Sequence, residues 1–112
     1  MMQIEEIREI ALSLPSTVEV EHWGKPSFRI NNKIFVVIQD DMSTITVKTT
    51  KEERELYTSM SPETYKIPDS FSNLNYMHIN LELANKDEVT DLIRNAWGIV
   101  APKKLSKAFF ES

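Results

Sequence analysis

The sequence predicts an α+β domain in which an antiparallel sheet carries the terminal helices on one face. Three observations predict this class. Apolar residues recur at helical spacing near both ends of the chain, alternate with polar residues between them, and the alternating runs are separated by short turn sequences. Strands joined by short turns pair antiparallel, and such a sheet commonly buries only one face. We expect a single domain over residues 1–112, because a chain of this length builds one core.

The first predicted element is a helix that ends before Pro15. Its apolar residues recur at steps of three and four: Ile4, Ile7, Ala11 and Leu14. Carboxylates and an arginine occupy the opposite side, which is the pattern of an amphipathic helix. Proline cannot continue a helix, so Pro15 marks its end.

A run of period two begins at Ser27. Phe28 and Ile30 alternate there with polar residues, and the segment KIFVVIQ follows the Asn-Asn pair at 31–32. Asparagine tolerates a positive φ, so this pair is typical of a hairpin turn. A second turn at residues 40–43 leads into the alternating TITVK. These segments predict a three-stranded meander, and we interpret the preceding Trp-Gly-Lys-Pro as a shaped turn.

A short helix is expected from Lys51, because Thr50 and Glu53 stand in the spacing of a capping box. Residues 61–75 contain two prolines and several turn-forming residues, which predicts an irregular connection. Connections of this length without regular structure are uncommon in compact domains and often functional.

The segment YMHINLEL at 76–83 alternates again and predicts another strand. Its inward residues would be Met77, Ile79, Leu81 and Leu83. Asn85 and Glu88 then form a second capping signature for a helix that reaches Pro102. The remaining KKLSKAFFES predicts a further turn or short helix.

Composition excludes several classes of function. Glycine occurs only at 24 and 98, so neither a P-loop nor a dinucleotide-binding fingerprint can be formed. There is no cysteine, and the two histidines, His22 and His78, lack the spacing of metal ligands. We therefore expect no metal, no cofactor, no catalytic residue and no enzymatic activity. The carboxylate-rich N-terminus is neither a signal peptide nor a membrane span, which favours a cytoplasmic location without a membrane partner.

The outer face of the predicted sheet gathers polar and basic side chains opposite the core: Arg29, Thr46, Lys48, His78 and Asn80. Phe35 and Val37 add apolar surface there, and either remain open or lie under the 61–75 loop, the last helix or a second subunit. A basic sheet face with aromatic residues is typical of single-strand nucleic-acid binders. The net charge of −4 opposes non-specific binding of this kind.

Several stretches together resemble the MmcQ/YjbR family of small bacterial proteins. They are the helix before Leu14-Pro15 with Glu19 after it, WGKPSFRINNKIFV, the NYMHINLE region and the closing DLIRNAWGIVAPKKLSK. The resemblance implies a compact α+β fold similar to the secretion chaperone-like and frataxin-like architectures. It also implies DNA binding, the role commonly given to family members. Many relatives place a tryptophan where this chain has Tyr76, Met77 and His78, so a stacking role of that tryptophan does not carry over.

Our hypothesis from sequence is a non-enzymatic DNA-binding protein. The candidate residues for contacts with phosphates or bases are Trp23, Lys25, Arg29, Lys48, His78, Lys103 and Lys104. Trp23 is also expected to cover an edge of the core. The alternative is a small module that binds a protein, a second copy of itself or a small ligand through the open sheet face or the 61–75 loop.

Overall fold

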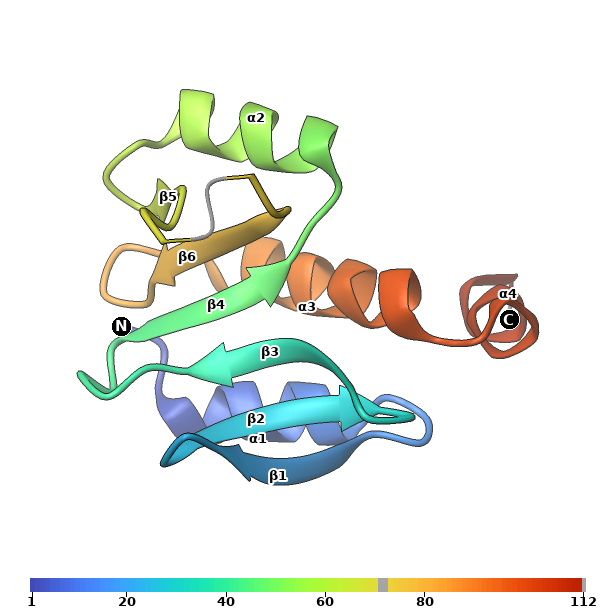
Figure 1. The fold of residues 1–112 in the computed structure, drawn as a ribbon. Helices are drawn as coiled ribbons and strands as arrows, with labels where there is room; N and C mark the ends of the chain where they lie inside the picture. Colours follow the sequence, from blue (N-terminus) through green and yellow to red (C-terminus); the bar gives the residue numbers. More distant parts are fainter. Residues whose placement is uncertain (71–72, 112) are drawn as a thin grey trace.

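The computed structural model describes residues 1–70 and 73–111 and contains one six-stranded sheet (Figure 1). The strands lie in the order β1-β2-β3-β4-β6-β5, and each neighbouring pair is antiparallel. Their bounds are β1 Val18–His22, β2 Lys25–Ile30, β3 Lys33–Ile38, β4 Thr44–Lys48, β5 Tyr65–Lys66 and β6 Tyr76–Asn80. The predicted α+β class with an antiparallel sheet is confirmed.

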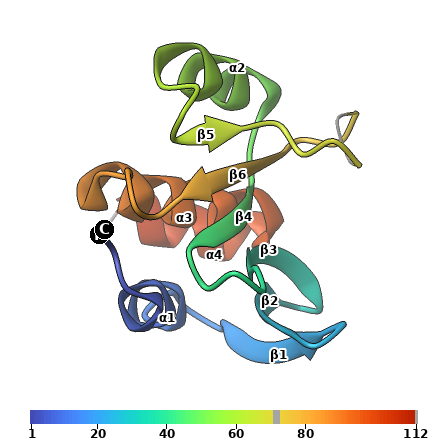
Figure 2. The same ribbon diagram turned by 90° about the vertical axis from the view of Figure 1, so that its left-hand side faces the viewer.

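Helices cover one face of this sheet and leave the other open. Their bounds are α1 Ile4–Leu12, α2 Lys51–Met60, α3 Lys86–Val100 and α4 Lys103–Glu111. Helix α3 packs on β3 and β4 and also contacts α1, so the first and third helices lie side by side under the sheet. Figure 2 shows these two helices on the same side of the strands, with α2 beyond the β5 end. The terminal helices therefore form the expected layer.

Two-residue alternation decides which side chains face the helices. The row Phe28, Val36, Val47 and Met77 runs across four paired strands, and all four side chains are fully buried. The neighbouring row is Ser27, Val37, Thr46, His78 and Lys66, and it points to the open face. A register shift between β2 and β3 leaves Phe35 without a partner, and this residue is buried as well.

The sequence analysis missed the first strand. Residues 18–22 pair with β2 along their whole length, so Trp23-Gly24 is the turn of a hairpin. Both turn residues have positive φ, +54° at Trp23 and +82° at Gly24, as two-residue hairpin turns require. The predicted Asn-Asn turn at 31–32 has the same form, with φ of +49° and +65°. Trp23 does not cover the core as expected, because it is 90% exposed.

The late strand is shorter than predicted. β6 ends at Asn80, whose side chain accepts a hydrogen bond from the Glu82 amide and turns the chain. Leu81 is buried as expected, whereas Leu83 is 57% exposed and does not face the core. Within the 61–75 connection the structure adds the short β5, and residues 71–72 lie outside the described residues.

Trp97 ties the helical layer to the start of the sheet. Its side chain is fully buried, and its indole Nε1 donates a 3.0 Å hydrogen bond to the carbonyl of Pro15. Helix α4 closes over the same ring, with the centroids of Phe109 and Phe110 at 5.0 and 6.1 Å. A Cβ on Gly98 would lie 2.8 Å from Phe110, so glycine permits this close approach. None of the helices described in residues 1–70 and 73–111 is long and apolar enough to span a membrane.

The two tryptophans give a direct test of this packing. Trp97→Phe removes a buried donor and leaves the Pro15 carbonyl unpaired, so we expect it to lower the free energy of unfolding by about 1–3 kcal/mol. Trp23→Phe changes an exposed ring and should cost about 0.5 kcal/mol or less. Urea denaturation followed by circular dichroism measures both, and equal costs would contradict the assignment of Trp97 as the anchor.

Candidate ligand-binding site on the open sheet face

The open face carries only basic charges from its strands. Lys25, Arg29, Lys48 and Lys66 belong to this face by alternation and register. The two acidic residues within the strands, Glu19 and Glu21, alternate onto the other side, and Glu19 pairs there with Arg8 of α1 at 2.8 Å. The carboxylates of the strands thus lie on the helix side, whereas their cations lie on the open face except for Lys33, which is paired with the buried Ile30.

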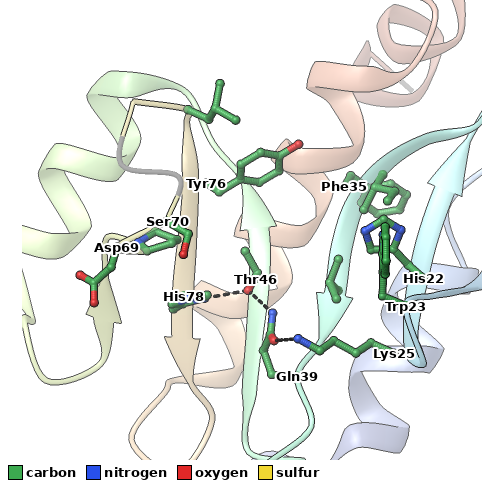
Figure 3. A pocket seen from close by; sticks show the side chains of 14 residues that line it. His22, Trp23, Lys25, Phe35, Gln39, Thr46, Asp69, Ser70, Tyr76 and His78 are labelled. Carbon is green, nitrogen blue, oxygen red and sulfur yellow. Dashed lines mark hydrogen bonds between the residues drawn. The ribbon is translucent and has the colours of Figure 1, made fainter.

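A pocket of about 650 Å³ lies in the middle of this face. The β1–β2 turn forms one wall with His22 and Trp23, and residues 68–70 with β6 form the opposite wall (Figure 3). The strands between the walls form the floor. The lining residues used below are Trp23, Lys25, Phe35, Gln39, Thr46, Asp69, Tyr76 and His78. A cavity of this size is suited to a small ligand or to part of a larger one.

A chain of hydrogen bonds crosses the floor from β2 to β6. The Lys25 Nζ donates to Oε1 of Gln39 at 2.8 Å, and Gln39 Nε2 donates to Oγ1 of Thr46 at 2.7 Å. Oγ1 of Thr46 lies 2.7 Å from Nδ1 of His78 (Figure 3). Four side chains on four strands or strand ends are therefore connected.

The environment favours a neutral imidazole at His78. Partial burial lowers the pKa of His78, since a charged ring would lose solvation, and the nearby Lys25 ammonium lowers the pKa further. Asp41 and Asp69 oppose this shift through their negative charge. Because the pKa of His78 lies below its ordinary value, the ring is mainly neutral at physiological pH.

The predicted site residues divide into two groups. Trp23, Lys25 and His78 line the pocket together. Arg29 lies on the same face beside it, where its guanidinium donates to Ser27 and Asn32 and lies 3.4 Å from Nδ1 of His22. The Lys48 ammonium sits 4.8 Å from the centre of the Tyr76 ring, which places it over one wall residue.

Lys103 and Lys104 do not join this group. Both are exposed on α4, which packs against the end of α3 and lies beyond the strands (Figure 1). These two candidate residues are therefore separated from the basic residues of the sheet face. A small ligand bound in the pocket would not reach these two lysines.

Sequence reasoning missed Gln39 as a pocket residue. The alternation that places Val37 outward also places Gln39 outward, so the signal was present just after the strand. Of the two apolar residues whose exposure the sequence left open, Val37 is half-buried in the pocket floor and Phe35 is fully buried. Among the described residues no group of three or more His, Cys, Asp and Glu is placed to hold a metal ion.

Comparison with known proteins identifies a family and a related fold. The YjbR family model matches residues 12–99 of the chain. The crystal structure of Deinococcus radiodurans protein DR2400, which carries the domain DUF419, superposes with a TM-score of 0.81 at 15% identity, covering 93% of this chain and 82% of that chain. No curated protein matches. The structural likeness supports the fold and, at this identity, carries no function with it.

The pocket electrostatics predict the effect of one substitution on a neighbour. Lys25→Met removes the cation that disfavours a charged imidazole, so the pKa of His78 should rise toward its ordinary value. An NMR titration of the His78 ring protons measures the change. As a control, Lys103→Met removes a positive charge from α4 and should leave the pKa of His78 unchanged. An unchanged pKa in Lys25→Met would show that Lys25 does not act on His78.

Proposed function

The chain belongs to the YjbR family, and from this premise we propose that it binds single-stranded DNA, without catalysis, on the open face of its sheet. The observation that carries the proposal is the charge of that face. Within the strands its charged side chains are all basic, although the chain as a whole has a net charge of −4. Phosphates need such a positive track, and a face free of strand carboxylates supplies it.

The net charge of −4 opposes DNA binding, but the distribution of the charges over the molecule reduces this effect. Acidic residues concentrate in the helices, with Glu5 and Glu6 in α1, Glu52 and Glu53 in α2, and Asp87 and Glu88 in α3. A polyanion that approaches the open face meets the strand lysines and Arg29 together with Asp69 of the pocket wall, whereas screening limits the reach of the helical carboxylates to about 10 Å at moderate salt. Binding should therefore be strongly salt-dependent.

Trp23 supplies a surface for stacking beside these charges. It stands on the β1–β2 turn at the edge of the pocket and is 90% exposed, so an unpaired base has access to its ring. Stacking of a base on an aromatic side chain contributes about 1–3 kcal/mol and tolerates any sequence. Duplex bases are already stacked and paired, which is why we propose single-stranded rather than double-stranded DNA.

A second candidate function is the binding of a free small molecule. The specific observation in its favour is that the pocket has two facing walls, with residues 68–70 opposite the Trp23 turn (Figure 3). A continuous strand would need to enter and leave past these walls, whereas a small ligand needs only the pocket.

Two double variants, each of which removes two positive charges, test where DNA binds. Lys25→Ala/Lys48→Ala removes two positive charges from the open face and should weaken binding of a fluorescent oligo-dT by about 5- to 20-fold. Lys103→Ala/Lys104→Ala removes two from α4 and should change affinity by about 2-fold or less. Fluorescence anisotropy at several salt concentrations measures both, and the first variant should also show the shallower salt dependence.

The fluorescence of Trp23 gives an independent readout. Trp97 is fully buried, so quenching of the intrinsic emission by oligo-dT reports the exposed ring, and Trp23→Phe should abolish it. If the unaltered protein fails to bind oligo-dT at low salt, the proposed function is wrong. Equal weakening by the two lysine pairs would instead remove the open face as its location.

A further inference from the structure

The hydrogen-bond chain across the pocket floor has a defined direction. A lysine ammonium can only donate, so Lys25 requires the carbonyl oxygen of the Gln39 amide to face it. The amide nitrogen of Gln39 must then face Thr46 and donate to its hydroxyl oxygen. The hydroxyl proton of Thr46 is thereby left for another acceptor.

That acceptor is Nδ1 of His78, at 2.7 Å from the Thr46 oxygen. A neutral imidazole that accepts at Nδ1 carries its own proton on Nε2. Partial burial and the Lys25 charge both favour the neutral ring, in agreement with this tautomer. Within the described part of the chain, no hydrogen bond of Nε2 is found, so its N–H is available to a ligand.

The hydrogen bonds across the floor therefore occupy acceptor atoms of these side chains and leave several N–H donors unused. Lys25 retains two further N–H groups, the Gln39 amide retains one, and His78 offers Nε2–H. These groups lie along the floor of the pocket from Lys25 to His78, while Tyr76 lies further along β6 and Trp23 stands on the wall beside Lys25 (Figure 3). The ligand that complements this arrangement has an acceptor-rich anionic group at one end and a flat ring at the other.

We propose that the pocket binds a nucleoside monophosphate unit, with the phosphate on the Lys25–Gln39–His78 floor and the base against the aromatic side chains of the walls. The inference rests on the proposed function only in part, because a DNA strand is one of two sources of this unit and a free nucleotide is the other. A terminal phosphate has three acceptor oxygens and about −1.5 to −2 charges, whereas an internal phosphodiester has two free oxygens and a single charge. The site therefore selects a phosphorylated strand end or a free nucleotide over the interior of a strand.

Within the described part of the chain, Asp69 is the one carboxylate that lines the pocket. Its charge opposes an anion, and it is placed on the wall of residues 68–70 rather than in the hydrogen-bond chain (Figure 3). Asp41 and Asp69 both act on His78 against the Lys25 ammonium, whose effect on the pKa of the ring is larger than that of either carboxylate.

The test compares two oligonucleotides that differ only in one phosphate. The full chain is titrated with 5′-phosphorylated and 5′-hydroxyl oligo-dT of eight nucleotides, and separately with thymidine 5′-monophosphate, thymidine and inorganic phosphate. We expect the phosphorylated strand to bind about 5-fold or more tightly than the hydroxyl strand. Thymidine 5′-monophosphate should bind more tightly than thymidine or phosphate alone and should displace the phosphorylated strand.

Matched threonine variants test the role of the hydrogen-bond chain. Thr46→Val removes the hydroxyl that orients His78, and the preference for the 5′-phosphate should fall to about 1- to 2-fold. Thr46→Ser keeps the hydroxyl and should restore the preference. Thr44→Val lies two residues away on the same strand and loses only a bond to Asp41, so it should keep the preference.

The outcomes separate this inference from the proposed function. Equal binding of the two strands, together with equal binding of thymidine 5′-monophosphate and thymidine, overturns the inference and leaves single-stranded DNA binding in place. Binding of the monophosphate without binding of either strand supports the inference and overturns the proposed function, with a free nucleotide as the source. A preference for phosphate that survives in Thr46→Val overturns the assignment to this hydrogen-bond chain.

Discussion

The packing of α3 against β3 and β4 is the constraint on which the rest of the structure depends. Its buried stripe includes Leu92, Ile93 and Trp97, and these side chains need an apolar surface opposite them. Only one face of an alternating sheet supplies that surface, so the helix fixes which rows are buried. The side chains that alternate to the other side, from Ser27 to His78, lie together on the open face. The open face, where the candidate site lies, is thus a consequence of covering one side only.

This division also explains how an acidic protein presents a basic face. Glu19 alternates to the helix side, where Arg8 of α1 neutralises it, whereas Lys25 and Arg29 on the adjacent strand alternate to the open side. A register slip of one residue would exchange the two sets and place the basic side chains under the helices. The core that specifies the register therefore specifies the sign of the exposed charge as well.

Much of the fold follows from local sequence, because the buried rows and the caps are local signals. Thr50 and Asn85 cap α2 and α3 as their spacing indicates, and the Asn-Asn turn adopts the expected positive φ values. β1 escaped detection because it buries no side chain and exists through its pairing with β2. The pocket was only partly predictable. Thr46 meets His78 because β4 pairs with β6, and no local pattern reveals a pairing between strands so far apart in sequence.

Trp23 departs most clearly from what folding alone requires. A bulky residue with φ of +54° is strained relative to glycine or asparagine, and its ring is 90% exposed, so it gains little from burial. Asparagine, as found at 31–32, would fit such a turn with less strain. Strain and exposure at one position are together characteristic of residues that contact ligands. The tight hairpin also holds the ring at the edge of the pocket without a flexible loop, so stacking there would cost little conformational entropy. The fold therefore does not account for a tryptophan at this position, whereas the proposed stacking role does.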